Sequence, residues 1–269
     1  MKMKNWRKYN GALVSLTPPH VDVNIKGIVE KIKENNAYFA RWTSNFDSKK
    51  ESEFWYVIQD VPMYMEDYSK NTRSKIRRGL KKCSVELINS KRILEDGFEC
   101  YNAAFINYNT HLKSKTREEF LIEISELEGD WEFWAIFHEN EMIGYSQNKI
   151  IDNYCDYSTI KFHPNYLKLY PSYALFYTMN KYYLNEKNFK YVNDGARSIS
   201  HDTNIQEFLI QKFQFRKAYC QLHVKYSPKI KFILNIIYPF RFLISVIKLK
   251  VFKKMQVILI QEKIRRSFE

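Results

Sequence analysis

Apolar and polar positions follow the most regular pattern between Trp131 and Lys161. Aromatic and branched side chains fill three segments of this stretch, and short polar runs separate them; the segments are Glu132–His138, Met142–Ile150 and Tyr154–Lys161. Aromatic and β-branched residues favour strands, whereas polar clusters favour turns. The pattern therefore predicts three consecutive antiparallel strands.

A helical period follows these strands. Apolar and aromatic side chains recur every three or four residues from Tyr173 to Leu184, which predicts a helix. The chain then predicts, in order, a short strand at Lys190–Val192, a helix from about Thr203 to Phe213 and a strand at Arg216–Tyr226. This order of elements resembles the core of GCN5-related N-acyltransferases (GNAT) without its first helices. The resemblance implies an α/β (α+β) fold with a mixed, mainly antiparallel sheet flanked by helices.

The N-terminal part predicts a partial second unit of the same kind. Its elements would be a strand at Gly11–Leu16, a helix from Asp22 or Asn24 to about Glu34, and strands at Tyr38–Asn45 and Phe54–Gln59. We therefore expect a partial N-terminal GNAT-like unit over residues 1–90, a GNAT-like acyltransferase domain over residues 91–226, and a basic, apolar extension over residues 227–269.

The segment Lys70–Lys82 carries seven cations in 13 residues and no acid. It predicts a helix capped by Ser69, with an apolar stripe of Ile76, Leu80 and Cys83. One interpretation is a solvated helix surface. However, like charges one turn apart repel each other, so we favour binding of phosphate or phospholipid. The candidate substrate-binding residues here are Arg73, Arg77 and Arg78.

This basic helix carries a more specific resemblance. Residues 68–87 resemble the segment of FemAB-like proteins in which a basic helix, R-x-x-I-R-R-x-x-K, enters a strand. Residues 116–120, followed by 133–137 and 142–145, are similar to the helix-then-strand entry of the same families. The similarity spans roughly residues 65–225. It implies two acyltransferase-type units and transfer of an acyl or aminoacyl group to an amine, in a family with relatives associated with cell-envelope polysaccharides.

The amino-acid composition argues against several kinds of functional site. Only seven glycines occur, and they form no glycine-rich phosphate loop. The four cysteines are far apart and show no metal-binding spacing, so we expect neither a zinc site nor a disulfide framework, and a reducing, cytoplasmic location fits better. The formal net charge of +13 predicts an anionic partner such as a nucleic acid, a nucleotide or a phospholipid surface.

The resemblance also implies where the reaction occurs. In acyltransferases of this fold the fourth strand and the next one splay apart, and backbone groups there hold the acyl donor; the matching segments are Tyr154–Lys161 and Lys190–Val192. Asp156 lies between aromatic residues, whose burial would raise its pKa toward that of a useful base. The alternative is a strand-surface acid paired with a cation. Tyr154 and Ser158 share its face and are candidate substrate-binding residues.

A polar turn at residues 193–202 supplies the other candidates. Asp194 is a second candidate for the base. Arg197 would bind a carboxylate or phosphate, and Ser198 and His201 would donate or shuttle a proton. A surface or capping role is the alternative for His201.

The donor site departs from the acetyl-CoA pattern. The family has a Q/R-x-x-G-x-G/A loop that holds a pyrophosphate at a helix N-terminus, whereas residues 162–174 contain no glycine. Pro171 can still begin a helix, so Ser172 and Tyr173 are the candidate cofactor-binding residues. Near the end of the domain, Ile210 stands where the family has a tyrosine acid and Gln214 where it has glycine.

The last 43 residues have a different composition. They contain ten Lys and Arg against two Glu, which accounts for eight of the 13 net positive charges, and large apolar residues lie between the cations. Their cations do not gather on one helix face, and polar residues interrupt any spanning segment. We expect association with an anionic membrane surface. The alternative is an extension that packs on the core or on another subunit.

Together these features predict a cytoplasmic acyltransferase that is peripheral on the inner membrane face. It would transfer an acyl group from acyl-CoA or another thioester to an amine of a cell-envelope sugar or polysaccharide precursor, which would be phosphorylated or lipid-linked. No metal is expected. The alternatives are an aminoacyl-tRNA-dependent transferase of FemAB type, with tRNA as a partner, and a non-catalytic GNAT-fold binding protein. The sequence does not predict the oligomeric state.

Overall fold

The computed structural model describes residues 5–106, 113–127, 129–199, 204–245 and 250–268. The chain forms two compact units that are discontinuous in sequence. Unit 1 comprises Met1–Tyr56, Ala196–Thr203 and Lys217–Glu269, and unit 2 comprises Val57–Gly195 and Asn204–Arg216. The division into consecutive domains 1–90, 91–226 and 227–269 stays a prediction.

Unit 2 is built on a mixed sheet with the strand order β9-β8-β7-β6-β5. The strands are β5 (Ser84–Ile88), β6 (Trp131–His138), β7 (Glu141–Ile151), β8 (Tyr154–Phe162) and β9 (Tyr191–Ala196). Neighbouring strands from β5 to β8 are antiparallel, whereas β8 and β9 are parallel. The predicted run of three antiparallel strands is therefore confirmed as β6, β7 and β8.

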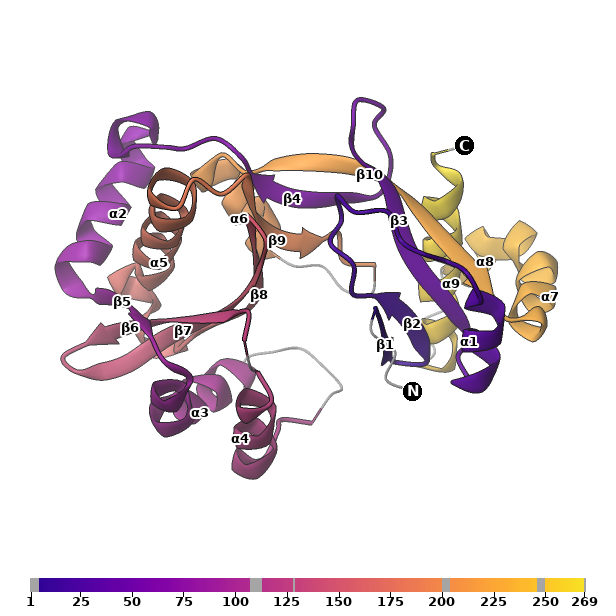
Figure 1. The fold of residues 1–269 in the computed structure, drawn as a ribbon, viewed down its shortest axis with the longest axis horizontal. Coiled ribbons are helices and arrows are strands. Elements are labelled where there is room, and N and C mark those ends of the chain that lie inside the picture. Colours follow the sequence, from indigo (N-terminus) through magenta and orange to yellow (C-terminus); the bar gives the residue numbers. More distant parts are fainter. Residues whose placement is uncertain (1–4, 107–112, 128, 200–203, 246–249, 269) are drawn as a thin grey trace. The chain divides into compact units, whose positions relative to one another are not determined.

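Helices cover both faces of this sheet, with α3 and α4 on one face and α2 and α5 on the other (Figure 1). The helices of unit 2 are α2 (Lys70–Lys82), α3 (Ser90–Ile106), α4 (Arg117–Ser125), α5 (Pro171–Asn180) and α6 (Asn204–Phe213). Short turns η1 (Met65–Asp67) and η2 (Pro164–Leu169) precede α2 and α5, and the π-helical turn η3 (Lys181–Glu186) continues α5. This is the mixed α/β architecture expected from the sequence.

Alternation along β6 explains why its residues are apolar on both faces. Phe133 and Ala135 are buried in a cluster with Phe120 of α4. Trp134 points to the opposite face, because successive side chains of a strand alternate. There its indole Nε1 donates to the Tyr183 hydroxyl of η3 at 2.9 Å. The two faces of the strand thus hold the two helix layers.

Unit 1 contains the N-terminal strands and the strand β10. Its elements are β1 (Trp6–Tyr9), β2 (Ala12–Ser15), α1 (Ile28–Glu34), β3 (Phe39–Ser48) and β10 (Arg216–Tyr226), and the chain passes from unit 1 to unit 2 within β4 (Trp55–Gln59). β2 pairs with β3 in parallel, and β10 pairs with β3 antiparallel. Strand β1 was not predicted, and α1 begins later than expected, after Gly27 in the left-handed conformation (φ 71°).

The C-terminal extension belongs to unit 1 and is helical. It forms α7 (Pro228–Ile237), η4 (Tyr238–Phe240), α8 (Arg241–Ser245) and α9 (Lys250–Arg266). No helix in the described residues is both long enough and apolar enough to cross a membrane.

Helix α9 is attached to the core of unit 1. Ile264 is 1% exposed and packs with Phe54, Cys220 and Leu222. Glu262 is buried, and it accepts hydrogen bonds from Arg265 and Arg266 at 2.8–3.0 Å. Burial alone would raise the pKa of Glu262, but these hydrogen bonds lower it. Packing on the core, the alternative weighed for the extension, therefore describes α9.

Candidate functional site

Strands β8 and β9 are in register over only three residue pairs, from Tyr154 with Tyr191 to Asp156 with Asn193. Both strands continue beyond this point, β8 to Phe162 and β9 to Ala196. The two strands therefore part directly after Asp156 and Asn193. Asp194 is the first residue of β9 beyond the paired segment. The splayed strand pair expected from the resemblance is present, but β9 continues to Ala196, beyond the predicted end at Val192, so Asp194 lies in a strand and not in the predicted turn.

Asp156 is held by neutral donors. Ser158 Oγ donates to its Oδ2 at 2.9 Å, and Asn193 Nδ2 donates to its Oδ1 at 3.0 Å. Burial raises the pKa of Asp156, while the Ser158 hydrogen bond, the charge of Lys149 and the Asn193 hydrogen bond lower it. Lys149 lies opposite Asp156 in the β7–β8 register. A buried carboxylate with hydrogen bonds to its charged form keeps more of that charge than burial alone would allow.

The influences on the pKa of Asp194 both act to raise it. Burial raises its pKa, and the neighbouring charge of Asp156 raises it further, to about 8. Two carboxyl groups in one partly buried site resist ionising together, which separates their pKa values. A group with a pKa near 8 exchanges protons readily at physiological pH, as a general base must.

A β-bulge adjoins this carboxyl pair. Gln147 pairs with Thr159 but Asn148 pairs with Tyr157, so Ser158 is the extra residue of β8. A bulge takes one residue out of the hydrogen-bonded ladder and redirects its side chain. Here it places the Ser158 hydroxyl on Asp156. Three of the predicted site residues, Asp156, Asp194 and Ser158, thus come together at one point of unit 2.

A buried amide beside the carboxyl pair was missed by the sequence analysis. Asn180, near the end of α5, is 3% exposed, and its Oδ1 accepts from the Tyr157 hydroxyl at 2.7 Å. Its Nδ2 makes no hydrogen bond of standard geometry, but the Asn180 side chain lies close enough to the Tyr68 hydroxyl to oppose the rise that burial causes in the pKa of Tyr68. The charge of Asp194 contributes to the raised pKa of Tyr157, after burial, so this amide belongs to the same neighbourhood. In the sequence, the signal for this residue was its polar side chain within a helical pattern of apolar residues.

A second polar network lies deeper in the unit. The Tyr183 hydroxyl donates to Glu132 at 2.8 Å and accepts from Asn148 at 3.1 Å. Ser146 donates in turn to Asn148. Tyr183 belongs to the π-helical turn η3, a kind of irregularity that is frequent at functional sites. These contacts fix the strand β7 behind the carboxyl pair.

The predicted donor residues lie at the start of α5. Tyr173 is buried, its ring packs against Phe208 and Phe213, and its hydroxyl accepts from Lys75 at 3.4 Å. Ser172 is partly buried beside it. Their role in holding a donor stays a prediction.

Backbone N–H groups in the first turn of α5 already donate hydrogen bonds within the protein. The backbone N–H groups of Tyr173 and Ala174 both donate to the carbonyl of Tyr170, at 3.1 and 3.2 Å. Tyr170 adopts the left-handed conformation with φ 62°. Helix α2 approaches closely here, since a Cβ added to Gly79 would lie 2.7 Å from that carbonyl. The Ala174 bond is the ordinary first bond of an α-helix, but the Tyr173 N–H is also engaged and Pro171 has no N–H, so fewer N–H groups remain for a pyrophosphate than at an open helix N-terminus.

Of the apolar stripe predicted for α2, Ile76 and Cys83 are buried, but Leu80 is not. Thr72, Ile76 and Gly79 face inward, whereas Leu80 is 39% exposed. Gly79 has no side chain, so α5 can approach α2 closely at this position. The pattern of large apolar residues in the sequence does not predict this contact.

The three candidate arginines of α2 differ in their contacts. Arg73 donates to the Glu66 carbonyl at 3.2 Å, and the Arg78 guanidinium lies 5.1 Å from the Tyr170 ring centre. Arg77 is exposed. Binding of phosphate by these residues stays a prediction.

The remaining predicted residues of the polar turn belong to unit 1. Arg197 donates to the Glu53 carbonyl at 2.5 Å and lies over the Trp55 ring at 4.7 Å. Ser198 follows it in the chain, and His201 lies outside the described residues. Tyr154, in unit 2, is 3% exposed and stacks on Tyr191 with ring centres 4.9 Å apart. Its side chain therefore supports the paired part of β8 and β9.

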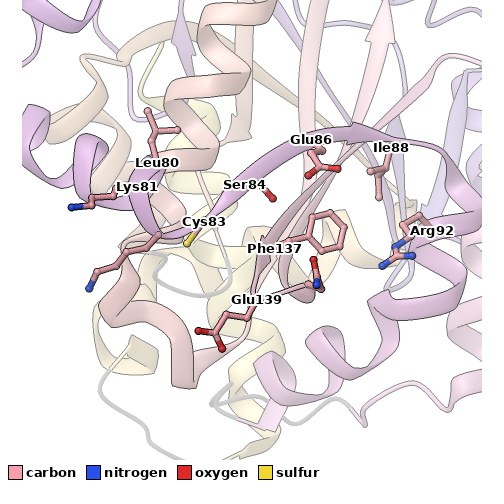
Figure 2. A pocket seen from close by; sticks show the side chains of 11 residues that line it. Leu80, Lys81, Cys83, Ser84, Glu86, Ile88, Arg92, Phe137 and Glu139 are labelled. Carbon is pink, nitrogen blue, oxygen red and sulfur yellow. The ribbon is translucent and has the colours of Figure 1, made fainter.

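A separate hollow of 690 Å³ lies at the β5 edge of unit 2 (Figure 2). Three strands separate β5 from β9 in the sheet order, so the hollow is not the carboxyl site. Its lining mixes cations, acids and apolar groups: Leu80, Lys81, Lys82, Cys83, Ser84, Glu86, Ile88, Arg92, Phe137, Glu139 and Asn140. Arg92 lies 5.4 Å from the Phe137 ring centre. In the described residues, no group of three or more His, Cys, Asp or Glu is placed to hold a metal ion.

Known structures share this architecture. No protein-family model and no curated protein matches the chain in sequence. The crystal structure of FemX superposes with a TM-score of 0.57 at 10% identity, covering 86% of this chain and 85% of that one. The C-terminal domain of a lysylphosphatidylglycerol synthetase from Agrobacterium fabrum gives 0.56 at 10% identity, covering 86% and 83%. L-PGS from Bacillus licheniformis gives 0.52 at 11% identity, covering 97% and 85%.

These matches extend over most of each chain and include both units. The protein therefore has the FemAB-like variant of the GNAT fold. At this level of identity the likeness concerns the fold, and the chemistry must be argued from the site.

Proposed function

We propose that this protein transfers an acyl or aminoacyl group to an amine, with Asp194 as the general base. The observation that carries the proposal is the carboxyl pair at the point where β8 and β9 part: Asp156 is held by Ser158 and Asn193, and the pKa of Asp194 is raised to about 8. The nitrogen of a neutral amine acceptor must give up one proton to become an amide nitrogen. A base with a pKa near 8 suits that task.

In the proposed reaction the Asp194 carboxylate takes a proton from the acceptor nitrogen as this nitrogen attacks the donor carbonyl carbon. A new C–N bond forms, and the bond from that carbon to the oxygen or sulfur of the donor breaks. The leaving group then receives the proton from Asp194. The products are an amide and the free alcohol or thiol, and Asp194 returns to its starting state.

Asp156 acts on this base through its charge. Its carboxylate is stabilised by two neutral hydrogen bonds, so it remains close to Asp194 as a negative charge. That charge helps to raise the pKa of Asp194. We assign Asp156 as a positioning residue and Asp194 as the catalytic residue, which narrows the two candidates given by the sequence.

The developing oxyanion needs hydrogen-bond donors. One feature of this neighbourhood supports their presence: the bulge takes Ser158 out of the β7–β8 ladder. Preorganised donors of this kind stabilise the transition state because they need no reorientation during the reaction.

An aminoacyl ester of tRNA is favoured over a CoA thioester as the donor. The N–H group of Tyr173 is bonded to Tyr170 and Pro171 has no N–H, which leaves a poor pyrophosphate site. The exposed cations of α2, including Arg77, would contact the RNA backbone. The similarity to a lysylphosphatidylglycerol synthetase, whose name indicates a lysyl-lipid product, also fits aminoacyl transfer. A cell-envelope precursor carrying an amine remains the proposed acceptor.

Mass spectrometry with a panel of donors tests the proposal. Acetyl-CoA, a long-chain acyl-CoA and aminoacyl-tRNA would each be incubated with amino-sugar nucleotides and a lysine-containing peptide, with Asp194→Asn as the matched control. The proposal expects an amide product from one donor, with the largest yield from aminoacyl-tRNA, and a large loss in the variant. No product with any donor, together with saturable binding of one of them, would favour the non-catalytic alternative.

A further inference from the structure

Helix α7 is apolar on both of its faces. Leu234 is 3% exposed and faces the protein. Phe232, Ile233 and Ile236 lie on the opposite side and are 69%, 47% and 54% exposed. A helix that is apolar all round is normally buried in a protein core or in a membrane. In α7 only one of the two apolar faces is covered.

The exposed apolar surface continues beyond α7. Phe240 of η4 is 57% exposed, and Phe242 and Leu243 of α8 are 71% and 67% exposed. Pro239 interrupts the helix between them, so the surface extends over two short helical pieces. Large aromatic and aliphatic side chains of this number rarely remain in water on a monomeric protein. We call residues 228–243 the apolar strip.

The apolar strip itself carries only positive charges, and Glu262, close to its edge, is paired with Arg266, which lies over the Tyr238 ring. From Ser227 to Gln261 the sequence contains no Asp or Glu. Lys229 and Lys231 are exposed on α7, and the Arg241 guanidinium lies 4.7 Å from the Tyr238 ring centre and 4.5 Å from that of Phe242. An occupant of this surface must therefore offer apolar groups and negative charge together.

We infer that the apolar strip docks on an anionic lipid bilayer. Its phenylalanine and leucine side chains enter the boundary between headgroups and acyl chains, and its cations bind the lipid phosphates. Helix α9 is attached to unit 1 through the buried Ile264 and Glu262, and its Arg266 lies over the Tyr238 ring of the strip at 4.1 Å. The membrane contact thus involves residues 228–243 and not the whole basic extension. Binding does not require the transfer reaction, so an inactive protein would still bind.

Vesicle sedimentation with the full chain tests this inference. Vesicles of phosphatidylglycerol and phosphatidylcholine would be compared with phosphatidylcholine alone. One variant carries serine in place of four strip residues: Phe232→Ser, Phe240→Ser, Phe242→Ser and Leu243→Ser. The control carries serine at four comparably exposed residues of unit 2: Val61→Ser, Ile106→Ser, Ile122→Ser and Leu167→Ser.

The parent and the control should bind the anionic vesicles. The strip variant should bind at least about a hundredfold more weakly, because each lost apolar group removes part of the insertion free energy. Lys229→Glu with Lys231→Glu should weaken binding on the order of tenfold or more and keep the native melting temperature. Equal binding by parent and strip variant would overturn the inference. So would a parent that ignores anionic vesicles and forms a dimer that the strip variant abolishes, since a second copy would then be the occupant.

Discussion

The side chain of Asn193 links the Asp156 carboxylate to the backbone of Gly195, the residue after Asp194. Its Nδ2 donates to Asp156 at 3.0 Å, and its Oδ1 accepts from the backbone N–H of Gly195 at 2.9 Å. Gly195 adopts φ 87°, a left-handed conformation that glycine takes without strain. Asn193 thus fixes Asp156 and the backbone next to Asp194 at the point where β8 and β9 part.

Asp156→Asn should change the pH dependence of the reaction more than it abolishes the reaction. Removing the charge of Asp156 removes one of the two causes that raise the pKa of Asp194. The rising limb of turnover against pH should therefore shift to lower pH, with measurable activity left. A complete loss of activity with no such shift would instead identify Asp156 as the base.

Asp194→Asn should make the stability of the protein less dependent on pH. The pKa of Asp194 is about 8 in the folded protein, against 3.8 as the ordinary value. Between these values the folded state holds a proton that the unfolded chain has lost, so the free energy of unfolding falls as pH rises from about 4 to about 8. The asparagine side chain does not ionise, so the variant lacks this contribution to the pH dependence of stability.

Melting temperatures measured from pH 4 to pH 9 check this. The parent should lose more stability than Asp194→Asn across that window. The exposed Asp152→Asn serves as the control and should follow the parent. Parallel curves for the parent and Asp194→Asn would show that Asp194 ionises normally.

The sequence predicted local structure well and non-local relationships less well. Alternation in Glu132–His138 and its two neighbours gave the strands β6, β7 and β8, because side-chain period is a local property. The bulge at Ser158 depends on how β7 and β8 register, which no single segment encodes. Leu80 looked like the third residue of a buried stripe, but Gly79 takes that place because α5 approaches there. The left-handed Gln214 (φ 57°), at the family's glycine position, has no local signal.

The candidate site was predictable in part for the same reason. Asp156 and Asp194 were recognised from their aromatic and polar neighbours in sequence, and the resemblance supplied the strand pair. Asn180 stands out in the sequence as a polar residue within the apolar helical pattern, but its contact with Tyr157 depends on how α5 packs on β8, which the sequence does not show. His201 lies outside the described residues, so its role stays a prediction.

Gly79→Ala should destabilise the protein by about 1–3 kcal/mol. The added Cβ would lie 2.7 Å from the Tyr170 carbonyl oxygen, and a backbone atom cannot rotate away as a side chain can. Alanine normally stabilises a helix relative to glycine, so a destabilising effect of Gly79→Ala would show that the clash with the Tyr170 carbonyl outweighs helix propensity. Denaturant unfolding checks it, with the exposed Asn71→Ala on the same helix as a control that should be neutral or stabilising.

Arg77→Glu with Arg78→Glu should weaken binding of the donor. If α2 binds RNA backbone, affinity for aminoacyl-tRNA falls steeply as salt rises, and the double variant lowers both the affinity and the salt slope. Fluorescence anisotropy at several salt concentrations measures both. Lys91→Glu with Lys187→Glu, at exposed cations outside α2, should leave the slope nearly unchanged. An unaltered slope in the α2 variant would remove this helix from the donor site.

The most direct test of the proposed function is the initial rate of amide formation, measured from pH 5 to pH 9.5 for the parent and for Asp194→Asn. The parent rate should rise with pH and level off above about 8, where Asp194 is ionised. The variant should be slower on the order of a hundredfold or more at the plateau and should lose that inflection, with an unchanged melting temperature at pH 5. A variant with the parent's rate and the parent's inflection would contradict the assignment of Asp194 as the base.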